Sequence, residues 1–231
     1  MNLKQILNAV LARSVFLQKD SFALSVDPDD VQMMAIANEV ISEYRDFYPW
    51  SRLSETFDLD LTLDTVYDLP EDYLSVTPDS AWETDGSRKV DLPVPRNRWF
   101  MYKYSSLTDA GTVRARLYGN TIEINEPGLA SEISLEYVSK YTVLDSDGNP
   151  KEYFTADSDT FKLDDDTLIK GIQGYWAEAK MMPQADRWLQ RFNKGMTAQI
   201  GIDNSAQTIG GIGRGMDRRS PYYPLWRTSN S

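Results

Sequence analysis

Apolar and polar positions follow a helical period at the start of the chain. In residues 3–11 the apolar side chains recur every three or four positions, which predicts an amphipathic helix. A second helix is predicted to begin at Asp27, because aspartate suits the N-cap and Pro28 suits the first helical position. Pro49 ends this second pattern. The apolar positions of the two stripes are Leu3, Ile6, Leu7, Val10, Leu11, Met33, Ile36, Ala37, Val40, Ile41 and Tyr44.

The period then changes from helical to alternating, which is typical of strands. Phe and Leu alternate with Asp and Thr over residues 57–64, which predicts a strand with one buried and one acidic face. A Gly-Asn pair between strands expected at 113–118 and 121–125 indicates a two-residue hairpin. Residues 96–107 fit either a short helix or a strand. The further strands expected are 72–76, 79–84, 88–92 and 133–137.

Helical periodicity returns near residue 165 and continues to about residue 201. Residues 164–166 are all aspartate and suit a helix start, Pro183 would open a last helix, and Gly201 would end it. Because helices flank a central run of strands, the sequence predicts an α+β fold: a helix bundle with a central β-rich insertion and an extended C-terminal tail. The expected division is 1–50 and 164–201 for the helix-bundle domain, 51–163 for the β-rich insertion and 202–231 for the extended C-terminal tail.

Composition narrows the possible chemistry. The 231 residues include no cysteine and no histidine, which removes disulfides, Cys/His metal sites and Ser-His-Asp triads. The formal net charge of −11 disfavours DNA binding over the whole surface and would suit a surface past which DNA slides. No run approaches the roughly 18–20 apolar residues that a membrane helix needs, so we expect a soluble protein without an export signal.

The last twenty residues differ from the rest of the chain. Residues 212–231 hold four arginines and one aspartate in an otherwise acidic protein. Their aromatic side chains, beside two prolines, have the character of anchors for a partner pocket, to which arginines add polar and stacking contacts. A plain disordered terminus is the alternative, although such tails usually lack aromatics. The predicted partner-binding residues are Arg214, Arg218, Arg219, Tyr222, Tyr223, Leu225, Trp226 and Arg227.

No residue is predicted to be catalytic, to bind a cofactor or to ligate a metal. The glycines of residues 211–215 lack the spacing and the flanking strand and helix of a nucleotide-binding loop. The acidic loop that begins at Asp145 fails as an EF-hand, because position 6 is Pro150 and position 12 is Asp157. A hairpin turn is the favoured interpretation of this loop.

Carboxylates alone can hydrolyse glycosides, so an enzyme remains a rival interpretation. A glycosidase needs one carboxyl with a raised pKa beside apolar aromatics and a second one nearby. Glu83 next to Trp82, or Glu178 near Trp176, would be the candidate acids. With 35 acidic residues in the chain, chance pairs are certain, and the sequence singles out none of them.

Four segments stand in an order that is more specific than any one of them. They are 67–73 (YDLPEDY), 79–86 (DSAWETDG), 154–159 (FTADSD) and 163–172 (LDDDTLIKGI), the last continuing to Tyr175, Trp176 and Lys180. In this order and spacing, over about residues 27–200, the chain resembles the head-to-tail adaptors (tail-tube or head-completion proteins) of short-tailed bacteriophages. The basic tail matches no motif of that family, so its contacts are assigned from composition.

The resemblance implies a structural virion protein that is not an enzyme and needs no cofactor. It implies a homo-oligomeric ring, commonly of twelve copies, that connects head and tail and lines the DNA ejection conduit. The implied partners are the portal protein, the tail nozzle or tail-tube protein, further copies of the chain, and viral DNA that passes without sequence-specific binding. No membrane partner is implied. The implied location is the head–tail junction of the virion, after synthesis in the host cytoplasm.

The same resemblance places the β-rich region toward the tail and a C-terminal extension on the portal. The basic, aromatic tail suits this portal-binding role. The rival functions are a virion-associated peptidoglycan-degrading enzyme, a receptor- or carbohydrate-binding tail module, and an acidic DNA mimic. The module would show repetitive β sequence, and the mimic would lack the basic tail.

Overall fold

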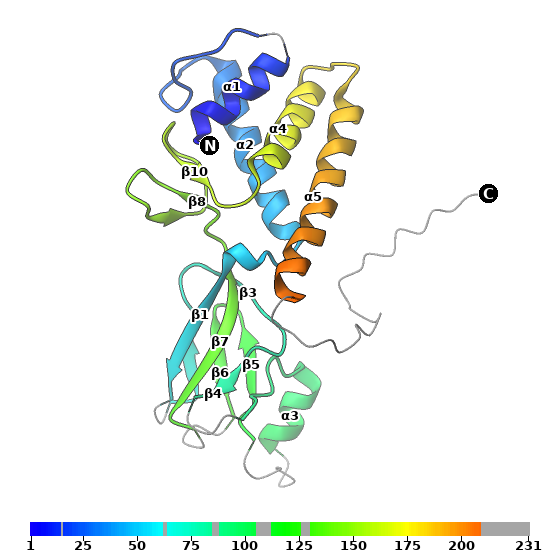
Figure 1. Ribbon diagram of the computed structural model, residues 1–231. Helices are drawn as coiled ribbons and strands as arrows, with labels where there is room; N and C mark the ends of the chain where they lie inside the picture. Colours follow the sequence, from blue (N-terminus) through cyan, green and yellow to red (C-terminus); the bar gives the residue numbers. More distant parts are fainter. Residues whose placement is uncertain (15, 62–63, 85–87, 105–111, 126–129, 209–231) are drawn as a thin grey trace, which may run out of the picture.

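The long helices and most of the strands lie toward opposite ends of an elongated molecule (Figure 1). The computed structural model describes residues 1–14, 16–61, 64–84, 88–104, 112–125 and 130–208. The mixture of helices and sheets agrees with the predicted α+β class. We call the part formed by the described residues of 1–50 and 143–208 the helical module, and the part formed by those of 54–139 the β module.

The helical module is built around α4. Helices α1 (Leu3–Arg13), α2 (Pro28–Phe47) and α5 (Ala185–Thr208) all contact α4 (Asp165–Ala179). As predicted, Asp27 caps α2, where its carboxylate accepts the Asp29 amide, and Asp164 caps α4 in the same way. The fully buried side chains of this module include Leu3, Ile6, Leu7, Val10, Val40, Ile41, Leu168 and Ile172.

A small sheet completes the helical module. It pairs β8 (Val143–Leu144) with β9 (Pro150–Lys151) and β10 (Thr160–Phe161). Its buried side chains belong to the same hydrophobic cluster as the helices, as do those of Phe154 and Leu163. The range 51–163, expected to form the β-rich insertion, therefore contains residues that pack with the helices.

The β module is a sandwich of two sheets. Strand β7 (Glu132–Ser139) lies between β1 (Ser54–Asp60) on one side and β3 (Tyr73–Val76) with β4 (Trp82–Glu83) on the other; we call this the first sheet. In the second sheet, β6 (Thr121–Ile124) lies between β2 (Val66–Asp68) and β5 (Ala115–Tyr118). One core joins the sheets, with Leu59, Ile133 and Leu135 from the first and Ala115, Ile122 and Ile124 from the second. The 3-10 turn η1 (Ser51–Leu53) links α2 to β1.

Locally encoded parts of the β module match the sequence. Strands β5 and β6 form the predicted hairpin, with Gly119 at φ 61° in its turn. Residues 96–107, which fitted either structure, form helix α3 (Arg96–Tyr104) up to residue 104.

The strands expected at 79–84 and 88–92 are reduced to β4 and a single bridge between Trp82 and Lys89. Asp79, at φ 64°, has left the extended conformation there.

The last helix differs from its prediction at both ends. It begins at Ala185, two residues after Pro183, and it continues through Gly201 to Thr208. The reason for the longer helix is tertiary: Ser51 donates to Asp203 from both its amide and its hydroxyl, and Tyr48 donates to Asn204. Residues 202–208, expected to begin the extended tail, are therefore helical. No described helix combines the length and the apolar character that spanning a membrane requires.

Candidate interaction surfaces

The residues predicted to bind the portal lie outside the part of the chain that the structure describes. They are Arg214, Arg218, Arg219, Tyr222, Tyr223, Leu225, Trp226 and Arg227. The described residues do show where the tail begins. Helix α5 ends beside the β module (Figure 1), and the Tyr48 hydroxyl donates to Asn204 Oδ1 at 2.7 Å in its last turns. The tail therefore starts at the junction between the two modules.

The FTADSD segment, residues 154–159, forms hydrogen bonds that hold the N-terminal part of the chain in place. The Asn38 side chain bonds both the amide and the carbonyl of Phe154, at 2.9 and 3.2 Å. The Asp157 carboxylate accepts the Ser21 hydroxyl at 2.5 Å and the amide of Phe22 at 3.0 Å. Burial opposes ionisation of Asp157, but these hydrogen bonds outweigh it and lower the pKa of its carboxyl. The segment acts as scaffold.

The three aspartates before α4 are scaffold as well. Asp164 caps the helix, and Asp165 pairs with the amino group of Met1 at 2.5 Å. Asp166 pairs with Lys170 at 2.6 Å and with Arg13 at 3.2 Å, and hydrogen bonds from these partners lower the pKa of its carboxyl. The acidic run thereby fastens α1 to the start of α4.

The YDLPEDY segment, residues 67–73, carries the chain from one sheet of the sandwich to the other. Leu69 is buried in the core between the sheets, and its amide bonds the Asn120 carbonyl at 2.9 Å. Asp72 accepts the Tyr137 hydroxyl at 2.9 Å. Burial and the nearby Asp72 carboxylate raise the pKa of Tyr137. These contacts fix the crossing between β2 and β3.

In neither candidate glycosidase site does the glutamate lie against the tryptophan that was considered with it. Trp82 and Glu83 are neighbours in β4 and point to opposite faces, so Trp82 is 47% exposed and Glu83 only 2%. Glu83 Oε2 is paired with Arg88 Nε at 2.8 Å, a structural ion pair. In α4 the Trp176 side chain is buried, whereas Glu178 lies on the exposed side.

The loop that begins at Asp145 forms the turn between β8 and β9. The Asp145 carboxylate accepts the amides of Asp147 and Asn149, both at 2.8 Å, and the Asn149 side chain at 3.1 Å. These bonds, led by the side-chain bond from Asn149, lower the pKa of Asp145. Within the described residues, no group of three or more acidic side chains is arranged to hold a metal ion.

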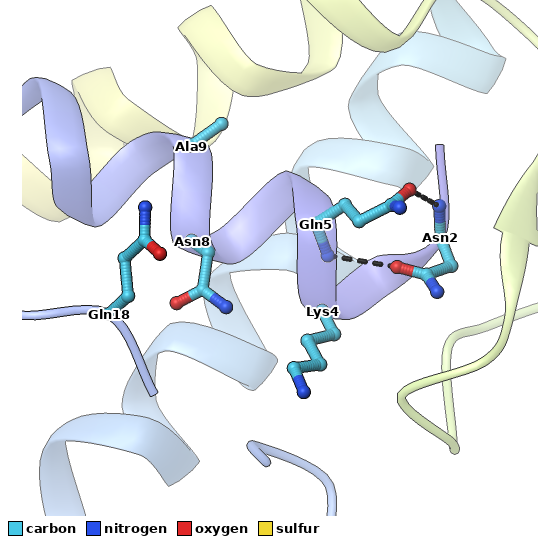
Figure 2. Close-up of a pocket in the computed structure, with 6 residues that line it drawn as sticks. All are labelled: Asn2, Lys4, Gln5, Asn8, Ala9 and Gln18. Carbon is cyan, nitrogen blue, oxygen red and sulfur yellow. Dashed lines mark hydrogen bonds between the residues drawn. The ribbon is translucent and has the colours of Figure 1, made fainter. Parts of the chain in front are cut away.

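A shallow polar depression lies over α1 (Figure 2). Three of its lining side chains have structural partners. Asn2 and Gln5 form the reciprocal capping box of α1, drawn as dashed lines. Asn8 bonds both the amide and the carbonyl of Lys19, at 2.8 and 2.9 Å. We therefore assign this depression to local structure.

The first sheet of the sandwich has an acidic outer face. Because Leu59, Ile133 and Leu135 point into the core, the alternate positions of β1 and β7 point outward. Asp60 stands directly opposite Glu132 across the strand pair. The carboxylates of this face, which we call the acidic sheet face, are Asp58, Asp60, Glu132 and Glu136.

The second sheet carries the basic helix α3 on its outer side. Arg114 and Arg116 flank the buried Ala115, so both point away from the core. The Arg114 guanidinium lies 4.1 Å from the Tyr102 ring of α3, and that of Arg116 lies 5.3 Å from the Trp99 ring. We call the outer surface of α3, with Arg96, Arg98, Phe100 and Met101, the α3 face.

Acidic and basic residues are clustered in separate ranges of the sequence, and these ranges correspond to the two faces. Residues 53–87 contain ten acidic residues and no Lys or Arg, and residues 119–139 contain four glutamates and no Lys or Arg. Between them, residues 88–118 contain seven Lys or Arg and two Asp. The blocks are visible in the sequence, but the faces on which they gather follow only from the strand topology.

A family model described as the SU10 adaptor protein matches residues 1–215, a range that includes all of the residues described above. No curated protein matches the chain.

Proposed function

The chain belongs to the SU10 adaptor protein family and is thus a phage structural adaptor protein of the virion, and from this premise we propose that it forms a ring between the portal and the tail. The single observation that carries the proposal is the extent of the family match, which covers both modules and every described element. The ring would be assembled from copies of this chain, twelve in the form that the family resemblance implies.

In the proposed ring, the β module faces the tail nozzle or tail-tube protein and the C-terminal tail reaches the portal. The number of residues after α5 is sufficient for the tail to reach the portal. After Thr208 the chain continues to Ser231, and 23 residues span up to about 75 Å when extended. Helix α5 itself is only about 36 Å long. A tail that starts at the module junction is therefore long enough to run back past the far end of the helical module.

The net charge of −11 supports a passive role toward DNA. An acidic conduit repels the phosphate backbone, so DNA passes without sequence-specific binding. We place the protein at the head–tail junction, after synthesis in the host cytoplasm, and we assign it no enzymatic step. The peptidoglycan-degrading enzyme gains no supporting observation, because the tryptophan–glutamate pairs considered above are not assembled into a site. The repetitive β sequence that a carbohydrate-binding tail module would show is not present in the chain.

Co-sedimentation with the portal protein tests the proposal. The full chain, mixed with assembled portal from the same phage, is expected to move to the portal fraction and to show a ring of added density by electron microscopy. The chain alone should sediment as a small species, because the contacts between copies are weak individually. They close a ring only when the symmetric portal holds many copies side by side. A chain that remains at the top of the gradient in the presence of portal would overturn the proposal.

A further inference from the structure

The acidic sheet face and the α3 face lie on opposite outer sides of one sandwich. The acidic sheet face belongs to the first sheet, and α3 stacks on Arg114 and Arg116 of the second sheet, with the shared core between them. In Figure 1, α3 lies beside β5, on the side of the β module away from β1. The module therefore presents opposite charge in opposite directions.

In the part of the chain that the structure describes, no Lys or Arg neutralises the carboxylates of the acidic sheet face. None of them forms an ion pair with another described residue; Glu132 accepts a hydrogen bond from the Thr84 hydroxyl at 2.8 Å. Directly opposed like charges, such as Asp60 and Glu132, destabilise a strand pair. A cationic neighbour would remove this repulsion.

The α3 face offers the complementary groups. Arg96 and Arg98 are exposed, and within the described part of the chain neither has an acidic partner. Arg96 lies over the ring of Phe100, with 6.0 Å to its centroid. Phe100 is 44% exposed and Met101 66%, so apolar surface accompanies the charge. On the acidic sheet face, Trp82 of β4 pairs opposite Ser134 and points outward, which supplies an apolar counterpart.

We propose that the acidic sheet face of one copy docks on the α3 face of the next copy. The contact joins two different surfaces, so it is heterologous and repeats from copy to copy around a ring. Carboxylate–guanidinium attraction guides the encounter and sets the register, while Trp82, Phe100 and Met101 exclude water at the centre. The inference rests on the proposed ring and adds to it which surfaces of the chain meet.

Cysteine cross-linking tests the geometry, because the natural chain contains no cysteine. One preparation carries Asp58→Cys and a second carries Arg98→Cys, and both are treated with a short bis-maleimide linker, separately and mixed, with portal protein present. A heterologous contact gives a covalent dimer in the mixture and none from either variant alone. The double variant Asp58→Cys/Arg98→Cys should give a ladder of multimers. Asp186→Cys on α5, mixed with Arg98→Cys, is the control for random collision and should not cross-link.

Charge reversal tests the chemistry. With portal protein present, Asp58→Lys/Asp60→Lys and Arg96→Glu/Arg98→Glu should each abolish association of the copies, and mixing the two reversed variants should restore it between unlike chains. Association of the natural chain should weaken steeply as salt is raised. If reversal at α3 instead removes retention of duplex DNA and leaves association of the copies intact, the α3 face serves DNA and the inference is overturned.

An amine-reactive cross-linker, which reports association through any surface, separates this inference from the proposed ring. Multimers from the amine reagent without a dimer between Asp58→Cys and Arg98→Cys would overturn the docking surfaces and leave the ring intact. Absence of multimers from both reagents, with portal present, would overturn the ring and the docking surfaces together.

Discussion

Gly171 of α4 lies against Val40 of α2, so closely that a β-carbon at Gly171 would stand 2.5 Å from Val40 Cγ1. It would also stand 2.9 Å from the Phe192 ring of α5. The glycine of the LDDDTLIKGI segment is therefore the point at which three helices meet, and its lack of a side chain permits their close approach.

Gly171→Ala should destabilise the helical module. Overpacking a well-filled core costs about 1–3 kcal/mol, which exceeds the gain in helix propensity. Urea denaturation followed by circular dichroism measures the loss. Gly201→Ala is the matched control, because a β-carbon there meets nothing within 4 Å, and it should stabilise α5 by up to about 1 kcal/mol. Equal effects of the two substitutions would contradict the packing assigned to Gly171.

Asp157 should make the free energy of unfolding depend on pH in the acidic range. Its carboxyl has a lowered pKa in the folded protein, so its contribution is complete above a pH of about 4 and is lost as the pH falls through the folded value. Asp157→Asn should reduce the free energy of unfolding at pH 7 by about 1 kcal/mol and flatten its decline toward low pH. Asp186→Asn, at an exposed position in the first turn of α5, is the control and should lower the free energy of unfolding at pH 7 by less than Asp157→Asn does.

Features of the fold that depend on neighbouring residues could be predicted from the sequence. The caps of α2 and α4 and the β5–β6 hairpin depend on residues within a few positions of each other, and all three were predicted correctly. The continuation of α5 beyond Gly201 depends on contacts with Ser51 and Tyr48, more than 150 positions earlier in the chain. The pattern of apolar and polar residues near Gly201 does not indicate these contacts. Phe154 and Phe161 join the helical core for the same reason: distant helices, not neighbouring residues, bury them.

The interaction surfaces were less predictable than the fold. Aromatic and basic residues at 96–104 fit a strand or a helix equally well, and stacking of Trp99 and Tyr102 on Arg116 and Arg114 accompanies the helix. The acidic alternation in β1 was recognised, but its placement opposite Glu132 required the pairing of β1 with β7. The portal-binding residues predicted in the tail stay a prediction.

Tyr48 should control the order of the helix end from which the tail departs. Tyr48→Phe removes the hydroxyl that bonds Asn204 and should cost about 1 kcal/mol, felt mainly in the last turns of α5. Hydrogen exchange of the amides of residues 203–208 should become faster by roughly fivefold or more. Tyr153→Phe, at a half-exposed tyrosine for which no hydroxyl bond is described, is the control. Unchanged exchange in Tyr48→Phe would show that α5 holds its end without this contact.

The basic, aromatic tail should be needed for portal binding and dispensable for folding. Deletion of residues 212–231 should leave a monomer with an unchanged circular dichroism spectrum that no longer co-sediments with portal. A chain of equal length, with these residues replaced by glycine and serine, should fail in the same way, since anchors rather than length supply the affinity. Undiminished co-sedimentation of either variant would contradict the assignment of Arg214, Trp226 and the other tail residues to the portal contact.

A reconstruction of the intact virion at its head–tail junction would show directly whether the chain forms the proposed ring. We expect a ring of repeated density between portal and tail into which the helical and β modules fit, with the β module toward the tail. Density for this chain elsewhere in the particle, or a portal joined to the tail without it, would overturn the proposed ring.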